Sequence, residues 1–454
     1  AIFSAERGAK VLLLDHAEKL GGTLWVAHGQ MSAAGTRLQR EKGIEDSADE
    51  HYKDVMRISR NTAHPGLVRL AVDNAGATFD WLMDMGLVPG DDQPVKGFGH
   101  EPYLKDRYYW SKDWGIGVKD VLVPIVERHA AEERISIRLQ HEVTELITDE
   151  AGAVIGVVAL DADGTRHEFS GHNVALTSGG YGANPEMFAE LSGYPQYHGG
   201  PYSFARGAGI KLGQSVGGYL RGHKNVFNNF GALFNTDNFP ARPVARVETF
   251  PEWRAPWEIY VNVHGQRFIR EDIESVDARE IALYGQPQRR FWIIFDQHIL
   301  DTAPPMIMNW TREEMMKAFA EGGPAFLKGD TVEELAEKAG IDADGLNASI
   351  YGYNYGIETG NDFFNRQFKP APIGVAPYYA LRMQGSSTSS AVGLTVNDDL
   401  QVIREDGSVI PNLFAAGELL GSGQTMGKAA CGGMMVTPAL TFGRLLGDQL
   451  IPLE

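Results

Sequence analysis

The sequence has very little cysteine, a deficit of positive charge and no long apolar run. Cys431 is the one cysteine among 454 residues, so an intrachain disulfide is excluded and we expect a reducing, cytoplasmic environment. No stretch approaches the roughly 18–20 apolar residues of a membrane-spanning helix, and the first residues have the wrong composition for a signal peptide. The formal net charge of −18 argues against nucleic acid or an anionic membrane as a partner.

Several familiar site patterns are also missing. The spacing of His, Cys, Asp and Glu residues matches no metal-binding pattern, so we expect no metal site. The chain has no order of Ser, His and Asp that is typical of a hydrolase triad, and no glycine-rich loop of the kind that binds ATP phosphates. These absences disfavour a metalloenzyme, a triad hydrolase and an ATP-using enzyme.

One further absence concerns the start of the chain. Residues 1–7 have the spacing of a helix that ends at Gly8, and residues 10–15 (Lys-Val-Leu-Leu-Leu-Asp) have the pattern of a buried parallel strand closed by an acid. This is the second half of a βαβ dinucleotide-binding unit, without its first strand and Gly-x-Gly-x-x-Gly turn. Asp15 then stands where an acid hydrogen-bonds the adenosine ribose. We expect the missing element to precede residue 1 in the parent protein.

The middle of the chain differs in character from its two ends. Residues 225–370 carry most of the prolines beside aromatic clusters, together with strand-like segments at 258–263 and 291–296. The ends share apolar strands followed by small-residue turns, and the chain is too long for one ordinary core. We therefore expect an α/β nucleotide-binding domain, formed by residues 1–224 and 371–454, that is interrupted by a second domain over residues 225–370.

The C-terminal region has glycines at a strand end and at a helix start. Residues 413–416 form a short apolar strand that runs into Gly417 and Glu418, and after a loop the pair Gly432-Gly433 opens an amphipathic helix. The free N–H groups at the start of a helix hold electron-rich or anionic groups. In a redox protein, the pyrimidine edge of a flavin, which gains charge on reduction, suits this position.

Three segments, taken in chain order, carry a resemblance to a known family. They are Val11-Leu-Leu-Leu-Asp15 with Gly21-Gly22-Thr23, Thr177-Ser-Gly-Gly-Tyr-Gly-Ala-Asn-Pro-Glu186, and Phe414-Ala-Ala-Gly-Glu418 with Thr441-Phe-Gly-Arg444. As an ordered set they resemble the FAD-dependent fumarate reductase/succinate dehydrogenase flavoprotein superfamily, which includes the 3-ketosteroid dehydrogenases. The likeness covers nearly the whole chain. It implies FAD as cofactor, a Rossmann-like FAD-binding domain, and an α+β capping domain over residues 225–370.

The resemblance also implies which residues bind the cofactor. Asp15 would bind the AMP ribose, Gly22 and Thr23 would lie at the pyrophosphate, and Val143 would present its backbone to adenine. The remaining cofactor-binding residues that it implies are Gly29, Gln30 and Met31 along the flavin ring, Gly179 and Gly180 near the dinucleotide, Glu418 on the ribityl chain, and Gly433, Met434 and Met435 at flavin N1/O2.

The superfamily moves a hydride between the flavin and a carbon of an activated C–C bond, while a protein group handles the other proton. That group stands four residues past the Glu of Arg267-Phe-Ile-Arg-Glu271, where this chain has the candidate catalytic residue Ser275. In the fumarate reductases that group is an Arg, and their substrate-binding His and Arg align with Asn229 and Ala430 here. These three losses argue against succinate or fumarate as substrate. The ketosteroid dehydrogenases have a Tyr at the position of Ser275 and a second Tyr at that of Ala429. Gly433 is retained, and its N–H group suits the polarisation of a ketone oxygen.

Because Ser275 replaces the usual proton-transferring residue, the candidates for this role come from an aromatic loop and from the capping domain. Tyr108, Tyr109 and His100 are the loop candidates, and a phenol needs a lowered pKa to act as a base at neutral pH. The alternative for these residues is a packed lid. Asp277, Arg270 and Arg279 flank Ser275 and are the capping-domain candidates, with surface ion pairs as their alternative role.

We therefore predict an FAD-dependent oxidoreductase that acts on a CH–CH bond next to a carbonyl. The first choice is the desaturation of a cyclic or steroid-like ketone, or the reverse ene reduction, with an electron donor or acceptor that the sequence does not identify. One alternative is a fumarate reductase-like enzyme for a small organic acid, with Arg221, Arg270 or Arg279 in a rearranged carboxylate clamp. Another is a flavin-free binding or subunit-type protein, if the chain naturally starts at Ala1.

Overall fold

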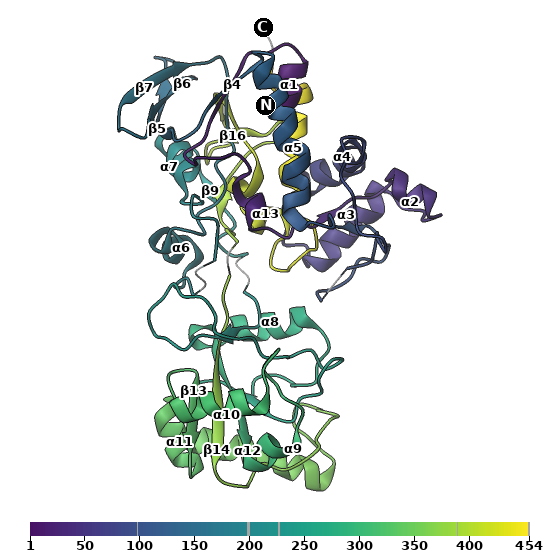
Figure 1. Cartoon of the computed structure of the whole chain (residues 1–454), viewed down its shortest axis with the longest axis vertical. Helices are drawn as coiled ribbons and strands as arrows, with labels where there is room; N and C mark the ends of the chain where they lie inside the picture. The colour runs from purple at the N-terminus through teal and green to yellow at the C-terminus, as the bar shows by residue number, and fades with distance from the viewer. Residues whose placement is uncertain (98, 198–199, 226–227, 388, 453–454) are drawn as a thin grey trace. The chain divides into compact units, whose positions relative to one another are not determined.

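The computed structural model describes residues 1–97, 99–197, 200–225, 228–387 and 389–452. Contacts within the chain divide it into two compact units, whose elements are labelled in Figure 1. The first unit consists of Ala1–Gly193, Pro201–Val226 and Ser389–Glu454, and the second consists of Tyr194–Gly200 and Phe227–Thr388.

This division differs from the expected domains at residues 194–200, which belong to the second unit, and at the second boundary. Residues 371–388 belong to the second unit, because β14 (Tyr378–Gln384) pairs with three strands of that unit. The apolar pattern of these residues predicts a buried strand, but it does not tell which sheet the strand joins.

The strands of the first unit include two parallel pairs. β1 (Val11–Leu14) pairs with β4 (Ile135–Arg138), and β8 (Val174–Leu176) pairs with β17 (Val409–Ala415), whose other neighbour is β16 (Gln401–Ile403). The alternating segments form an antiparallel meander of β5 (Glu142–Thr148), β6 (Val154–Leu160) and β7 (Arg166–Ser170). Two short antiparallel pairs are β2 (Met31–Ser32) with β3 (Tyr108–Tyr109), and β9 (Leu220–Arg221) with β15 (Gly393–Leu394).

The helices of the first unit begin at residues that their sequences favour as caps. Thr36 forms a capping box with Gln39, the Ser47 side chain accepts from the Glu50 N–H, and Pro65 takes the first position of its helix. The helices are α1 (Ile2–Glu6), α2 (Arg37–Glu41), α3 (Ala48–Ile58), α4 (Pro65–Asp84), α5 (Trp114–Ala131), α6 (Pro185–Ser192), α7 (Ala208–Ser215), α13 (Ser422–Thr425) and α14 (Val436–Leu445).

An apolar core in the first unit joins β2 and β3 to α4 and α5. Met31, Phe79, Tyr109 and Val118 are buried in it, each from a different one of these elements. Gly29, just before β2, lies against the first turn of α5, where an added Cβ would stand 2.7 Å from the Gly115 nitrogen. The core contact of Met31 and the close approach of Gly29 to α5 together fix the position of β2.

The second unit is an antiparallel sheet with helices. Its strand order is β10 (Ala232–Leu233), β14, β12 (Arg290–Asp296) and β11 (Ile259–Val261), with β13 (Phe326–Gly329) also paired to β14. Six of the seven residues of β12 are buried, as its near-continuous apolar sequence predicts. The helices are α8 (Val276–Tyr284), α9 (Gln297–Thr302), α10 (Arg312–Glu321), α11 (Val332–Ala339) and α12 (Ala343–Thr359).

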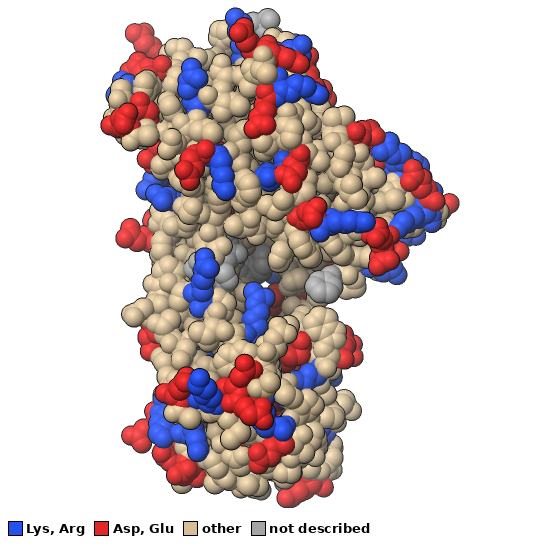
Figure 2. Space-filling model, in the orientation of Figure 1, with Lys and Arg blue, Asp and Glu red and all other residues tan. Residues whose placement is uncertain are grey.

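None of the helices in the described part of the chain combines the length and the apolar character that a membrane span requires. On the face shown in Figure 2, acidic and basic side chains are interspersed rather than sorted by sign.

Candidate functional site

Gly433 packs directly on the backbone of β2. Its φ is +81°, and a Cβ at this position would stand 2.3 Å from the Met31 carbonyl carbon and the Ser32 nitrogen, so only glycine fits without a shift. Thr437, in the first turn of α14, fastens the contact: the Ser32 N–H donates to its Oγ1 (2.8 Å), and its hydroxyl donates to the Ser32 carbonyl (3.0 Å). Two segments that the sequence assigns to the flavin ring, around Met31 and around Gly433, therefore meet.

Tyr108 lies against the same segment, and Tyr109 lies behind it. A Cβ at Gly432 would stand 2.9 Å from Cε2 of the Tyr108 ring. The Tyr109 ring is fully buried with its centroid 4.1 Å from that of Phe79, and its hydroxyl shares a hydrogen bond with Thr36 Oγ1 (2.8 Å). These contacts bring Tyr108 to the glycine pair and favour a packing role for Tyr109.

The phenol pKa values run against the expectation for a base. Burial raises the pKa of Tyr108, and Cys431 raises it further. Burial also raises the pKa of Tyr109, although the hydrogen bond with Thr36 lowers it in part. In the protein's own surroundings the pKa values of both phenols are thus raised rather than lowered, because burial outweighs the opposing effects, which for Tyr109 include the Arg107 charge.

Tyr103 contacts the glycine pair more directly than the two predicted tyrosines do. It is 2% exposed, its hydroxyl donates to the Gly432 carbonyl oxygen, and it lies 3.4 Å from Cys431 Sγ. The His51 ring lies nearly perpendicular to the Tyr103 ring, with 5.5 Å between the two ring centres. The sequence shows Tyr103 only as one of several aromatic residues in a loop, and nothing in that pattern singles it out.

A buried ion cluster supports this loop. The fully buried Arg107 guanidinium donates to both carboxylate oxygens of Asp46 (2.7 and 2.9 Å) and to Asp54 Oδ2 (2.8 Å). Its central carbon lies 5.4 Å from the centre of the Tyr103 ring. A fully paired, buried arginine holds its neighbours in one arrangement, because any movement breaks charge-assisted hydrogen bonds.

A second cluster forms where the parallel strands β8 and β17 end. Glu418 Oε1 accepts from the Ser390 N–H (3.0 Å), and Ser390 Oγ accepts from the Tyr181 N–H (2.8 Å). A Cβ at Gly180 would stand 2.0 Å from Ser390 Oγ and 2.8 Å from Glu418 Oε1. Burial raises the pKa of Glu418, against the opposing effect of the Ser390 hydrogen bond. Ligands of α/β folds bind at such carboxyl ends of parallel strands.

The remaining predicted cofactor residues of the first unit lie on several elements. Asp15 directly follows β1, its Oδ1 accepts from the Ala17 N–H (2.9 Å), and burial raises its pKa. Val143 pairs with Ala159 between β5 and β6. The others are Gly22 and Thr23 in the short 3-10 helix η1 (Gly22–Trp25), Gly29 and the partly buried Gln30 before β2, Gly179 after β8, and Met434 and Met435 before α14.

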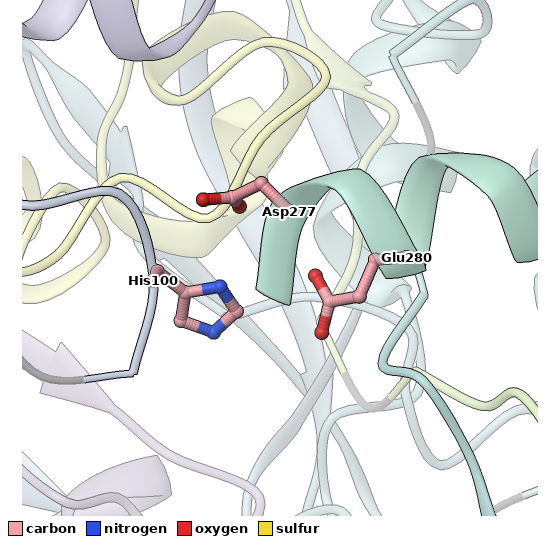
Figure 3. Close-up of side chains that lie close together, drawn as sticks. All are labelled: His100, Asp277 and Glu280. Atoms are coloured by element: carbon pink, nitrogen blue, oxygen red, sulfur yellow. The ribbon is translucent and has the colours of Figure 1, made fainter. Parts of the chain in front are cut away.

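Ser275 and its neighbours belong to the second unit. Ser275 caps α8, where its Oγ accepts from the Ala278 N–H (3.2 Å). Asp277 and Glu280 project from α8 one turn apart, as Figure 3 shows. His100, also drawn there, comes from the loop before β3 in the first unit.

The FAD binding domain family matches residues 1–434. The chain belongs to this family. A probable fumarate reductase of Shewanella frigidimarina (strain NCIMB 400) is 27% identical over 455 residues, which are 99% of this chain and 72% of the relative. A urocanate reductase of Eggerthella lenta is 29% identical over 461 residues, 98% of this chain and 71% of the relative.

A solved structure shares the fold of this FAD binding domain family member. The 3-ketosteroid delta1-dehydrogenase from Sterolibacterium denitrificans superposes with a TM-score of 0.72 at 22% identity, covering 99% of this chain and 96% of that one. The predicted superfamily, its mixed α/β fold and its FAD cofactor are confirmed, and so is the enzyme class, an FAD-dependent oxidoreductase acting on CH–CH groups.

The residues present fit FAD. Gly22 and Gly179 have φ values of +52° and +75°, and a Cβ at either would meet no atom within 4 Å, so the backbone there is open to a close approach. Glu418 offers a half-buried carboxylate that accepts hydrogen bonds from hydroxyl groups, and Asp15 offers a second one. Both carboxylates have raised pKa values in the protein alone, as expected for groups whose hydrogen-bond donors come from a cofactor.

Proposed function

We propose that this enzyme desaturates a cyclic or steroid-like ketone at the CH–CH bond next to its carbonyl, or performs the reverse ene reduction. When bound, FAD supplies the hydride chemistry. The observation that carries the proposal is the packing of Gly433 on the backbone of Met31 and Ser32. It supports a rigid position for the Gly433 amide, which polarises either the cofactor or a substrate carbonyl.

The same proposal assigns the cofactor contacts and a Rossmann-like arrangement of the FAD-binding part. The parallel pairs β1·β4 and β8·β17 support that arrangement, because Asp15 and Glu418 both follow such strands. We assign Asp15 to the ribose and Glu418 to the ribityl chain. The other proposed contacts are Gly22, Thr23, Gly29, Gln30, Met31, Val143, Gly179, Gly180, Gly433, Met434 and Met435.

A ketone is favoured over a dicarboxylate by the groups at two positions where fumarate reductases have an Arg. Ser275 uses its hydroxyl to cap α8. Ala430 carries only a methyl group and therefore neither binds a carboxylate nor transfers a proton. A substrate with two carboxylates would lack the cations that it needs at these positions.

Tyr108 is the proposed proton donor among the predicted catalytic residues. Its raised pKa keeps the phenol protonated at neutral pH, and its ring lies on Gly432. A protonated phenol donates a hydrogen bond or a proton but does not remove one, so this assignment favours the reductive direction.

A small unsaturated acid is the second candidate substrate. The relatives named above as fumarate reductase and urocanate reductase act on unsaturated acids. The specific observation in its favour is the buried Arg279 guanidinium, which forms no ion pair with a carboxylate of the described residues. The alternative of a flavin-free binding protein is disfavoured by the match of residues 1–434 to the FAD binding domain family.

The test starts with the absorbance of the purified full-length protein, which we expect to be yellow. The oxidised protein is then mixed anaerobically with a saturated cyclic ketone or with succinate, and the photoreduced protein with cyclohex-2-enone, fumarate or urocanate. Loss of flavin absorbance with the ketone, or its return with the enone, supports the proposal. A response to succinate or fumarate alone overturns the ketone assignment, and a colourless protein that cannot be reconstituted overturns the enzyme assignment.

We also propose a cytoplasmic location, which the scarcity of cysteine supports. Fractionation of the source cells, with antibody detection of the protein, tests it. Recovery from the periplasm or from the medium would contradict it.

A further inference from the structure

Arg279 carries a buried charge whose hydrogen bonds are incomplete. It lies on α8 and is 1% exposed. Its Nη1 donates to the Thr249 carbonyl oxygen, whereas its Nε and Nη2 are buried and have no hydrogen-bond partner in the part of the chain that the structure describes. A guanidinium stays protonated in proteins, so these two N–H donors cannot be removed by loss of a proton. A buried charge with unsatisfied donors is unfavourable unless an anion completes it.

The two unsatisfied nitrogens form one edge of the guanidinium, and another arginine of the same unit shows what that edge binds. Arg267 Nε and Nη2 donate to the two carboxylate oxygens of Glu271, at 2.8 and 2.7 Å. The edge therefore matches a carboxylate, which accepts both hydrogen bonds in one plane. Among the residues that the structure describes, no carboxylate forms an ion pair with Arg279, although Glu280 follows it in the sequence.

The surroundings of Arg279 add a third donor and two apolar walls. The Tyr260 hydroxyl on β11 is fully buried and has no hydrogen-bond partner among the described residues. Its ring centre lies 5.9 Å from that of Phe230, which the Arg279 guanidinium also approaches. Burial raises the pKa of Tyr260, and the charges of Arg254 and Arg279 oppose that rise. The guanidinium carbon lies 4.9 Å from the centre of the Phe250 ring and 5.6 Å from that of Phe230. Aromatic faces stabilise such a cation and suit an apolar ligand body.

The other two arginines of the carboxylate alternative are only partly buried, and each has a close polar neighbour. Arg270 Nε forms an ion pair with Asp272 Oδ1 at 3.1 Å, although without a hydrogen bond. Arg221 Nη1 lies 3.0 Å from His64 Nε2. Arg279 differs from both because it is fully buried and forms no ion pair with the described residues.

We propose that the Nε and Nη2 edge of Arg279 binds a carboxylate of the substrate, with the Tyr260 hydroxyl as a third donor. One guanidinium edge binds one carboxylate, and the Phe230 and Phe250 rings beside it favour an apolar body for the rest of the substrate over a second carboxylate. This inference rests on the proposed function and narrows it to substrates that carry one carboxylate besides the CH–CH bond, such as a cyclic keto acid or an unsaturated monoacid.

The test measures binding rather than turnover. The FAD-loaded protein is titrated calorimetrically with cyclohexanecarboxylate and, separately, with its neutral methyl ester. We expect the acid to bind and the ester to bind at least tenfold more weakly. Arg279→Met should weaken the acid about 10- to 100-fold, as expected for hydrogen bonds to a charged group. Arg279→Lys should recover part of the lost affinity, because lysine keeps the charge without the two-pronged edge. Tyr260→Phe should lower the affinity for the acid a few-fold.

A matched control distinguishes the loss of the Arg279 site from the loss of any positive charge in the second unit. Arg290→Met removes a partly buried cation of the same unit, which donates to Gln384 Oε1 (2.9 Å), and should leave acid binding unchanged. Without ligand, Arg279→Met should melt no lower than the unmodified protein, because it removes an unpaired buried charge. The acid should raise the melting temperature of the unmodified protein and of Arg290→Met, but not that of Arg279→Met.

The outcomes distinguish this inference from the function on which it rests. Equal binding of acid and ester, or acid binding unchanged in both Arg279→Met and Arg279→Lys, overturns the site. If Arg279→Met does not fold, Arg279→Lys and Tyr260→Phe decide the question by the same titration. If the acid binds through Arg279 but the flavin does not respond to carbonyl compounds, the carboxylate site stands and the proposed reaction is wrong. If neutral ketones are turned over but the acid does not bind, the reaction stands and the carboxylate site is wrong.

Discussion

The Tyr103 hydroxyl donates a hydrogen bond to the Gly432 carbonyl oxygen, and this bond ties the loop before β3 to the segment that precedes α14. The ring that carries this hydroxyl contacts the His51 ring, which is nearly perpendicular to it, and lies beneath the Arg107 cation. The next peptide group belongs to Gly433, which packs on β2. Tyr103 is therefore a positioning residue for the proposed flavin contact.

Tyr103→Phe should change the flavin more than it changes the fold. It removes one hydrogen bond, worth about 0.5–1.5 kcal/mol, and leaves a buried carbonyl oxygen without its donor. We expect FAD to remain bound, the midpoint potential of the flavin to shift and the rate of flavin reduction to fall about tenfold, since misplaced groups act on the transition state. Spectroelectrochemistry and stopped-flow absorbance measure the two effects.

Tyr353→Phe is the control for Tyr103→Phe. Its hydroxyl also donates to a backbone carbonyl, that of Ala371 (3.2 Å), but in the second unit. It should lower the melting temperature by a similar amount and leave the flavin potential unchanged. If both substitutions changed the flavin potential equally, the assignment of Tyr103 as a positioning residue would be wrong.

Gly433→Ala should expel or misplace FAD. The added Cβ would stand 2.3 Å from the Met31 carbonyl carbon, and the φ of +81° disfavours any residue with a side chain. β2 must then move, and with it the proposed flavin contact. We expect the ratio of flavin to protein absorbance after purification to fall at least severalfold. Gly443→Ala, within α14 and with open space around an added Cβ, should bind FAD normally and gain about 0.5–1 kcal/mol.

Local sequence patterns predicted the segments that carry the cofactor assignments. Asp15 and Glu418 follow short apolar strands, and the glycines near 180 and 433 stand at positions that need positive φ or close backbone approach. Each signal is local, because an apolar run, a strand end and a glycine turn all lie within a few residues of one another.

The partners of these segments could not be predicted in the same way. The hydrogen bond from Tyr103 to Gly432 and the burial of Arg107 between Asp46 and Asp54 join residues far apart in the chain. Periodicity reports which face of an element is buried, but not which distant side chain meets it. The same limit explains why the missing carboxylate partner of Arg279 is visible only in three dimensions.

Glu418→Gln should stabilise the FAD-free protein and weaken FAD binding. Burial raises the folded-state pKa of Glu418, so its carboxyl favours the folded state at low pH and this contribution is lost as the pH rises. The variant should therefore gain stability over the parent between about pH 4 and pH 7, in denaturant titrations without FAD. FAD affinity should fall about 10-fold or more, because the charged acceptor of the ribityl hydroxyls is gone. The exposed Glu405→Gln should change neither quantity; an unchanged FAD affinity in Glu418→Gln would contradict the ribityl assignment.

His51 should make the protein sensitive to mild acid. It is fully buried, neither ring nitrogen has a hydrogen-bond partner, and burial, followed by the charges of Arg107 and Arg69, lowers its pKa well below the usual value. The unfolded chain therefore binds a proton that the folded protein does not, and stability falls as the pH drops below about 6.5. His51→Phe keeps an aromatic ring beside Tyr103 and removes this proton, so its melting temperature should fall less between pH 7 and pH 5. The exposed His28→Gln serves as the control and should follow the parent protein, whereas an acid limb in His51→Phe as steep as in the parent would show that another group is responsible.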